Sequence, residues 1–214
     1  MTKGRLIALE GARGPSVTAA AHELLGRAAD DVQPGRISQW DASGLFGELR
    51  WNEPGAPRPS PRILVLLYAA DLAFRLRREI LPALEEGRSV VAGPYVQSAV
   101  AFGMAAGLSH RWLVELFRFA PEPRELYRLR EICGETECAC KPLDGYLEFC
   151  CEVLCPESRP WDSANLRRRF IEQFDLLESG QISGSPPIDR STRSTAGSKP
   201  GLTPLPQPRA GSPD

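Results

Sequence analysis

Apolar residues in the first hundred positions fall into short continuous runs separated by longer segments with helical spacing. The runs at 5–10 (Arg-Leu-Ile-Ala-Leu-Glu) and 89–93 (Ser-Val-Val-Ala-Gly) have the length and composition of buried strands. An Ala/Leu-rich segment at 17–28 follows the first run, and an apolar segment that ends over 80–87 precedes the second, so both predict helices. Strands that alternate with helices are typical of an α/β domain with a parallel sheet.

The second half of the chain shows one clear helical pattern, over 165–177. Its apolar side chains recur at i, i+4, i+8 and i+11, which predicts an amphipathic helix. These side chains are Leu166, Phe170, Phe174 and Leu177. The Arg-Arg-Arg run at 167–169 lies on the same helix and either faces solvent or contacts a phosphate.

From residue 179 the composition changes to Gly, Ser, Pro and Thr. This segment has few apolar side chains to offset the entropy lost on ordering. We therefore expect a folded domain over 1–178 and a disordered tail over 179–214. The run 203–208 (Thr-Pro-Leu-Pro-Gln-Pro) either forms a polyproline II docking segment or is unstructured like the rest of the tail.

The turn between the first strand and the first helix reads Glu-Gly-Ala-Arg-Gly-Pro-Ser-Val-Thr, which is the outline of a phosphate-binding loop. Gly11, Gly14 and Thr18 fit such a loop, in which backbone N–H groups surround the phosphates and a hydroxyl holds Mg²⁺. Val17, however, stands where the loop needs the lysine that reaches the β and γ phosphates.

Two further positions weaken the loop. Ser16 replaces the glycine before the lysine, and Pro15 removes a backbone donor from the turn. The alternative interpretation is an ordinary Gly/Pro turn between a strand and a helix.

The order and spacing of these segments over 5–108 resemble thymidylate kinase. The resemblance rests on retained framework positions, and it becomes vague beyond residue 108. The retained positions are Leu9-Glu10-Gly11, Gly47-Glu48, Ala70-Asp71, the helix end 80–87, Tyr95, Ser98 and Phe102. The resemblance implies a three-layer α/β domain of the P-loop NTPase type, with a central parallel sheet flanked by helices.

The same resemblance implies that reactive positions have been lost. Val17 replaces the loop lysine, Gln39 replaces the arginine of an Arg-Glu-Pro motif, and Leu72 replaces the arginine of Ala-Asp-Arg. Gly93 and Pro94 stand where the family has Asp-Arg before its tyrosine. Four cationic positions are therefore neutral, although phosphoryl transfer depends on positioning and on cations that stabilise the transferred group.

From the resemblance we expect a vestigial nucleotide site and no catalytic residue. Tyr68 and Phe102 match the walls of the nucleotide-base pocket, although buried aromatics also pack well without any ligand. Arg13 stands where the family has an acidic residue. The expected vestigial set is Gly11, Arg13, Gly14, Ser16, Thr18, Tyr68, Tyr95, Ser98 and Phe102.

We therefore expect an inactive, thymidylate kinase-like protein that binds a nucleotide such as dTMP or acts in regulation or as a scaffold. The alternative is an active dTMP kinase that uses Mg·ATP and relocated cations. The arginines close enough in sequence to serve are Arg13, Arg62, Arg75, Arg77 and Arg78. A further hypothesis is a homodimer through the helix predicted over 62–84, which is apolar around much of its circumference and matches a dimer-forming helix of the family.

All six cysteines lie between residues 133 and 155, where the family has its lid over ATP. Clustered thiolates can bind Zn²⁺ or an iron–sulfur cluster, and such a site would fix the 130–160 segment in place of a moving lid. Free or redox-active thiols and structural disulfides are the alternatives. The candidate ligands are Cys133, Cys138, Cys140, Cys150, Cys151 and Cys155.

Composition restricts the remaining classes of function. A formal net charge of −1 with no basic stripe argues against nucleic-acid binding. No segment reaches the length of about 18 continuous apolar residues that a membrane span needs. The first residues, Met-Thr-Lys-Gly-Arg, lead directly into the first strand without a hydrophobic signal segment, so we expect a cytoplasmic protein.

Overall fold

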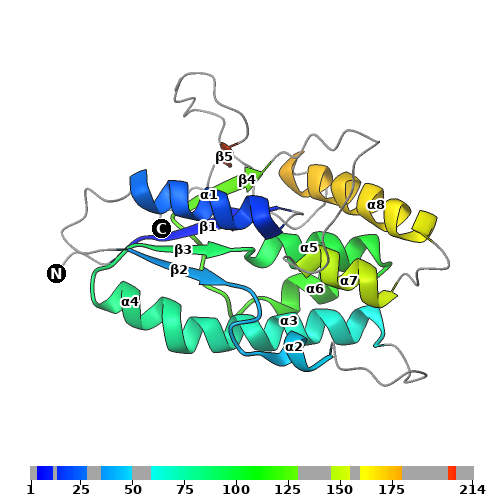
Figure 1. Ribbon diagram of the computed structural model, residues 1–214, viewed down its shortest axis with the longest axis horizontal. Helices are drawn as coiled ribbons and strands as arrows, with labels where there is room; N and C mark the ends of the chain where they lie inside the picture. Colours follow the sequence, from blue (N-terminus) through cyan, green and yellow to red (C-terminus); the bar gives the residue numbers. More distant parts are fainter. Residues whose placement is uncertain are drawn as a thin grey trace, which may run out of the picture.

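The computed structural model describes seven parts of the chain. These are residues 4–11, 14–27, 35–49, 59–129, 146–154, 160–179 and 202–205. They form a sheet with helices on both of its faces (Figure 1).

The sheet contains five described strands in the order β2-β3-β1-β4-β5. Strands β1 (Leu6–Glu10), β2 (Arg36–Gln39), β3 (Val90–Gly93) and β4 (Glu125–Leu129) are parallel, whereas β5 (Leu202–Leu205) pairs antiparallel with β4. The central parallel sheet expected from the sequence is therefore confirmed, with β1 and β3 in the predicted segments.

The register brings the carboxyl ends of the parallel strands to one edge. Leu6 lies opposite Val90 in the β1–β3 pair, and Gln39 lies opposite Gly93 in the β2–β3 pair. In open parallel sheets, ligands bind beyond this edge. Glu10, Gln39 and Gly93, which end their strands, therefore point to the region where a functional site belongs.

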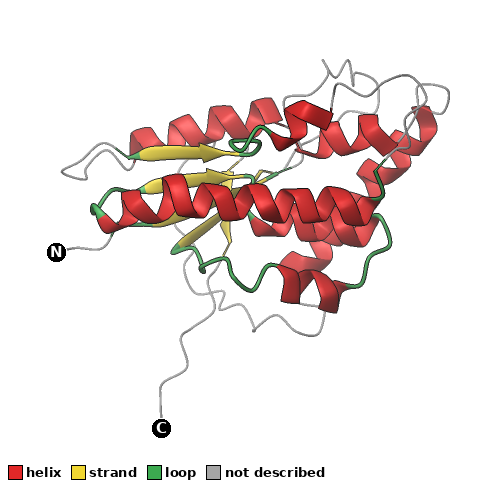
Figure 2. Cartoon of the chain, turned by 90° about the horizontal axis from the view of Figure 1, so that it is seen from below, coloured by secondary structure: helices red, strands yellow, loops and turns green. Residues whose placement is uncertain are grey.

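Alternation along the strands divides the core into two parts. Ile7, Leu9 and Val91 face α1 (Gly14–Arg27), whose buried side chains complete one cluster. Leu6 and Ala8 face the opposite side, where the larger cluster includes side chains from the other helices. Figures 1 and 2 show α1 and the long α3–α4 helix on opposite faces of the sheet.

The longest described helix packs in the larger hydrophobic cluster. Three consecutive elements, α3 (Pro61–Arg75), the π-helical turn η1 (Leu76–Ile80) and α4 (Leu81–Glu85), form one continuous helix, in agreement with the helix predicted over 62–84. Pro82 lacks the N–H that a regular α-helical ladder needs, which accounts for the local change of helix type. The other described helices are α2 (Leu45–Leu49), α5 (Val96–Ala105), α6 (His110–Leu116), α7 (Tyr146–Leu154) and α8 (Pro160–Ser179).

Two C-terminal predictions have different outcomes. The amphipathic helix expected over 165–177 lies within α8, and its four apolar residues are buried in the larger cluster. Leu202–Leu205, by contrast, forms β5 and so differs from the unstructured tail expected over 179–214. The rest of that segment lies outside the described residues, where the expectation stays a prediction.

Candidate functional site

Val17, at the position of the missing lysine, is a core side chain. It is only 3% exposed and packs with Leu9 and Val91 between α1 and the sheet. Its Cγ1 lies 2.9 Å from the place that a Cβ at Gly93 would occupy, and its Cγ2 lies 3.2 Å from the corresponding place at Gly11. Two glycines therefore leave the space that the valine methyl groups use.

The hydroxyl expected to hold Mg²⁺ is engaged by a neighbouring strand. Gln39 Nε2 lies 3.1 Å from Thr18 Oγ1 and donates a hydrogen bond to it. Gln39 ends β2 and stands where the resemblance places an arginine. The two side chains thus bind each other, which links the first turns of α1 to the carboxyl edge of the sheet.

The remaining loop residues are only partly described. Gly14 and Ser16 belong to α1, but their surroundings are not described. Arg13 lies outside the described residues. Gly11 donates its N–H to Ser98 Oγ at 3.2 Å. The predicted phosphate cradle therefore stays a prediction.

Glu10 is fully buried at the end of β1, where it accepts hydrogen bonds from the N-terminal turn of α5. Its carboxylate accepts hydrogen bonds from the backbone N–H groups of Tyr95, Gln97 and Ser98 at 2.8–3.1 Å, and from Ser98 Oγ at 2.6 Å. Burial raises the pKa of the Glu10 carboxyl, and these hydrogen bonds oppose that rise. A carboxylate at a helix N-terminus also complements the helix dipole.

Two residues of the expected nucleotide set therefore have clear structural partners. Ser98 bonds Glu10, and the Tyr95 hydroxyl donates to the Pro121 carbonyl at 2.8 Å. Burial raises the pKa of the Tyr95 phenol above its usual value. Ser98 thus joins α5 to the end of β1, and Tyr95 joins the β3–α5 turn to the segment before β4.

Arg75 is buried beside the same edge and is neutralised by its own helix. Its Nε lies 3.0 Å from Asp71 Oδ2, and both side chains are fully buried. The guanidinium also donates to the Pro94 carbonyl at 3.1 Å and to the Tyr68 hydroxyl at 3.3 Å. Asp71 in turn accepts the backbone N–H groups at 41 and 43, at 3.1 and 2.9 Å, so it anchors the turn after β2.

The other candidate arginines lie elsewhere. The Arg62 guanidinium stacks 5.1 Å from the centre of the Trp112 ring, and Arg77 and Arg78 are exposed on η1. Leu72, at another position where the resemblance expects an arginine, is buried in the core. Among the four described candidates, none is joined to the described part of the β1–α1 turn by a hydrogen bond or ion pair, and Arg75 is already paired.

Tyr68 and Phe102, the expected walls of a base pocket, have an aromatic side chain of the same protein beside them. The Tyr146 ring, from α7, lies with its centre 4.4 Å from that of Tyr68 and 5.3 Å from that of Phe102. It is 2% exposed. Burial, with smaller contributions from Cys150 and Tyr68, raises the pKa of the Tyr146 phenol well above its usual value.

Three more rings surround this one and complete what we call the aromatic cluster. Trp40, Phe46 and Phe149 have ring centres 5.1–5.9 Å from one another, and Tyr146 lies 6.2 and 5.8 Å from Trp40 and Phe46. The cluster is Trp40, Phe46, Tyr68, Phe102, Tyr146 and Phe149. Sequence analysis missed Tyr146, because it lies within the cysteine-rich segment and far along the chain from its partners.

The sequence and the fold of the chain can be compared with those of known proteins. No family model matches the chain. A probable thymidylate kinase of Pyrococcus abyssi is 47% identical over 58 residues, which are 27% of this chain and 28% of that protein. A probable thymidylate kinase of Pyrobaculum calidifontis is 31% identical over 119 residues, or 55% of this chain and 59% of that protein.

A solved structure has the same fold. The crystal structure of thymidylate kinase from Ehrlichia chaffeensis superposes with a TM-score of 0.58 at 14% identity, covering 84% of this chain and 83% of that one. Parts of the chain are similar in sequence to probable thymidylate kinases, and its fold is similar to that of a thymidylate kinase. The expected resemblance and the α/β fold of the P-loop type are thereby confirmed.

The chain matches only part of the length of these curated relatives. The matched segment spans 28% of the Pyrococcus abyssi protein and 59% of the Pyrobaculum calidifontis protein. No helix within the described ranges is long and apolar enough to cross a membrane.

The cysteine site expected from the sequence falls mainly outside the described residues. Cys133, Cys138, Cys140 and Cys155 are not described, nor is the side chain of Cys151. Cys150 is buried in α7 next to the aromatic cluster. Within the described part of the chain, no three His, Cys, Asp or Glu side chains form a group that could hold a metal ion.

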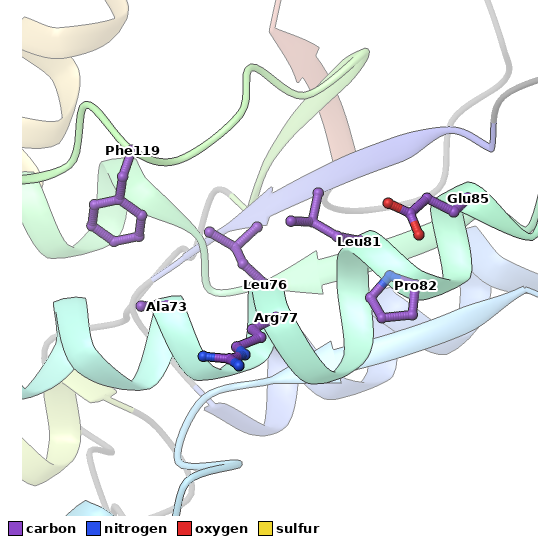
Figure 3. A pocket seen from close by; sticks show the side chains of 7 residues that line it. All are labelled: Ala73, Leu76, Arg77, Leu81, Pro82, Glu85 and Phe119. Atoms are coloured by element: carbon purple, nitrogen blue, oxygen red, sulfur yellow. The ribbon is translucent and has the colours of Figure 1, made fainter.

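A shallow groove lies away from the carboxyl edge, on the outer side of the long helix (Figure 3). Its volume is about 390 Å³. It lies beside α4, whose last turn approaches the start of β1 through the hydrogen bond from Gly4 N to Leu84 O at 3.0 Å. The lining residues are Ala73, Leu76, Arg77, Leu81, Pro82, Glu85 and Phe119.

Proposed function

We propose that this thymidylate kinase relative has lost phosphoryl transfer and serves as a regulatory or scaffold protein. The observation that carries the proposal is Val17, whose two methyl groups pack between α1 and the sheet against Gly93 and Gly11, where a catalytic loop needs a lysine. Phosphoryl transfer involves little covalent chemistry for the protein, so positioned cations supply most of the catalysis. Loss of one such cation can reduce the rate by about 10³–10⁵.

The surroundings of the other lost positions support the same proposal. Gln39 and Thr18 bond each other, so a metal ion at Thr18 would have to break that contact. Arg75 is a buried cation beside the carboxyl edge, and Asp71 neutralises it. An arginine released from that pair would leave a buried carboxylate without its partner, which is costly.

The experiment that tests the proposal is a turnover assay with dTMP and Mg·ATP, followed by calorimetric titration with each. We expect no formation of dTDP by the wild-type chain. Val17→Lys should also be inactive, because the other three cationic positions stay neutral. Formation of dTDP by the wild type would overturn the proposal and establish the alternative, an active dTMP kinase with relocated cations.

A scaffold role is favoured by the groove on the long helix, for which a second copy of the chain is the partner we propose. Arg77 and Glu85 are both exposed and lie two helical turns apart, with Leu81 between them (Figure 3). Two such helices that cross antiparallel at Leu81 would place each Arg77 beside the other copy's Glu85. Leu81 is 43% exposed and Phe119 is 47% exposed, so apolar area is available for burial.

Sedimentation of charge-swapped chains tests the dimer. Arg77→Glu and Glu85→Arg should each yield monomers, since like charges would meet across the interface, whereas the double variant should dimerise again. Arg78→Glu, on the same helical turn, is the matched control and should stay dimeric. A wild-type chain that sediments as a monomer at high concentration removes the proposal.

The cysteine ligands stay a proposal that the same purified sample can test. We propose Zn²⁺ or an iron–sulfur cluster on thiolates of the 133–155 segment other than Cys150, which is buried in the hydrophobic core beside Tyr146. Elemental analysis should find about one zinc or a stoichiometric amount of iron per chain. A metal-free protein whose thiols all react with an alkylating reagent would contradict this assignment.

A further inference from the structure

Tyr146, the first residue of α7, contacts aromatic rings of two other helices. Its ring lies against Tyr68 at an interplanar angle of 49° and against Phe102 at 75°, so it meets two rings from two other helices. Of these helices, α3 reaches the carboxyl end of β3 through the Tyr68 hydroxyl, and α5 begins at Val96, just after β3 ends at Gly93. The Tyr146 ring is therefore inserted where α3, α5 and the strand ends converge.

The contacts of Tyr68 locate this point at the ligand-binding edge of the sheet. The Tyr68 hydroxyl donates toward the Pro94 and Tyr95 carbonyls, each at 2.7 Å, directly after β3 ends at Gly93. Ligands of open parallel sheets bind beyond the carboxyl ends of the strands. A side chain buried at this point occupies volume that a ligand would otherwise fill.

We propose that Tyr146 is a built-in occupant of a ring-binding site and that α7 keeps this site closed to pyrimidine nucleotides. The Tyr68 and Phe102 rings hold the phenol ring in a tilted and an edge-to-face contact, and a pyrimidine ring of similar size can make contacts of the same kind. A ligand enters only when α7 withdraws Tyr146. The inference rests on the proposed thymidylate kinase-like function in one respect, the choice of a pyrimidine ring as the ligand.

The structure of α7 suits such an exchange. The helix has nine residues, and its described core contacts come from one side, through Tyr146, Leu147, Phe149 and Cys150. A short element can open locally without unfolding the sheet. The apparent affinity for the ligand is then reduced by the fraction of molecules in which the site is open.

Tyr146→Ala tests the inference, with Phe149→Ala as the matched control. Both residues are buried on the same helix and both belong to the aromatic cluster, but the Phe149 ring lies 5.9 and 5.2 Å from Trp40 and Phe46 instead of against Tyr68. Calorimetric titration with dTMP and with thymidine measures binding. We expect Tyr146→Ala to bind dTMP at least about tenfold more tightly than the wild type. Phe149→Ala weakens the docking of α7 but leaves the Tyr146 ring, so its gain in affinity should be clearly smaller.

A second measurement uses the wild-type chain alone. Cys150 is buried while α7 is docked, so its alkylation reports withdrawal of the helix. Tandem mass spectrometry can locate the adduct on Cys150 rather than on the adjacent Cys151. Alkylation of Cys150 should become faster in about 10 mM dTMP, because the ligand favours the open form. This measurement decides the question if Tyr146→Ala does not fold.

The outcomes separate this inference from the proposed function. Tight dTMP binding by Tyr146→Ala without formation of dTDP supports both, whereas binding with turnover keeps the inference and overturns the proposed loss of phosphoryl transfer. A folded Tyr146→Ala chain that binds dTMP no better than the wild type overturns the inference alone. Cys150 alkylation that is unchanged by dTMP in the wild type also overturns it.

Discussion

Gly93→Ala is the most direct test of the packing of Val17 against Gly93 at the position of the missing lysine. The new Cβ would lie 2.9 Å from Val17 Cγ1 and 3.3 Å from Leu9 Cβ, and the first of these distances is shorter than folded proteins tolerate. Both neighbours are buried, so neither can turn into solvent. Overpacking of this kind costs about 1–3 kcal/mol of the free energy of unfolding.

Val17→Ala should remove the conflict. Alone it deletes two buried methyl groups, which costs about 2 kcal/mol from lost burial and the cavity that remains. In the double variant, the Cβ added at position 93 enters space vacated by Val17 Cγ1. We expect the double variant to be no less stable than Val17→Ala alone, which corresponds to a favourable coupling energy of about 1–3 kcal/mol.

Urea unfolding followed by far-UV circular dichroism gives the four free energies of unfolding that this cycle needs. Gly26→Ala is the control, since a Cβ there meets no atom within 4 Å, and alanine should stabilise the exposed helix by about 0.5–1 kcal/mol. If the Gly93 and Val17 effects add to within about 0.5 kcal/mol, the two positions are independent and the packing argument is refuted.

Three other predictions concern buried charges. Asp71→Asn should cost about 3–5 kcal/mol of unfolding free energy in urea titration, since Arg75 loses its carboxylate partner in the core; a cost below about 1 kcal/mol would contradict the pairing. Because burial raises the pKa of folded Glu10, its contribution is present below the unfolded pKa and is lost as pH rises through the folded one. The stability of the wild type relative to Glu10→Gln should therefore fall as the pH rises above the usual pKa of a glutamate, measured by thermal unfolding, and a rise would contradict the direction of the shift. Arg128→Met should lower the free energy of unfolding by about 1–3 kcal/mol, because two partly exposed carboxylates on α8 lose their guanidinium partner. An unchanged free energy of unfolding would show that these ion pairs do not hold α8 to β4.

Local sequence patterns were sufficient to predict much of the fold. The runs at 5–10 and 89–93 contain β1 and β3, since continuous apolar runs of this length bury on both faces of a parallel sheet. The spacing of apolar residues over 165–177 likewise predicted the buried face of α8. These signals are short-range, because the residues that carry them belong to one element.

The arrangement of the candidate site depended on pairings that no local pattern contains. The contact between Gln39 and Thr18 joins a strand end to a helix, and Tyr146 reaches Tyr68 across 78 positions of sequence. Val17 could be identified as a missing lysine from the sequence, but its methyl groups were matched to Gly93 only once β1 and β3 were placed side by side.

The pairing of β5 with β4 has a practical consequence for any shortened form of the protein. Leu202–Leu205 covers the backbone of β4 from Leu126 to Leu129, so a chain that stops at Ser179 would leave the edge of the sheet open. Open edges pair readily with other strands and cause aggregation. Removal of the Pro- and Ser-rich end, a common step before crystallisation, would then create an artificial association between copies. The oligomeric state should therefore be measured on the full chain.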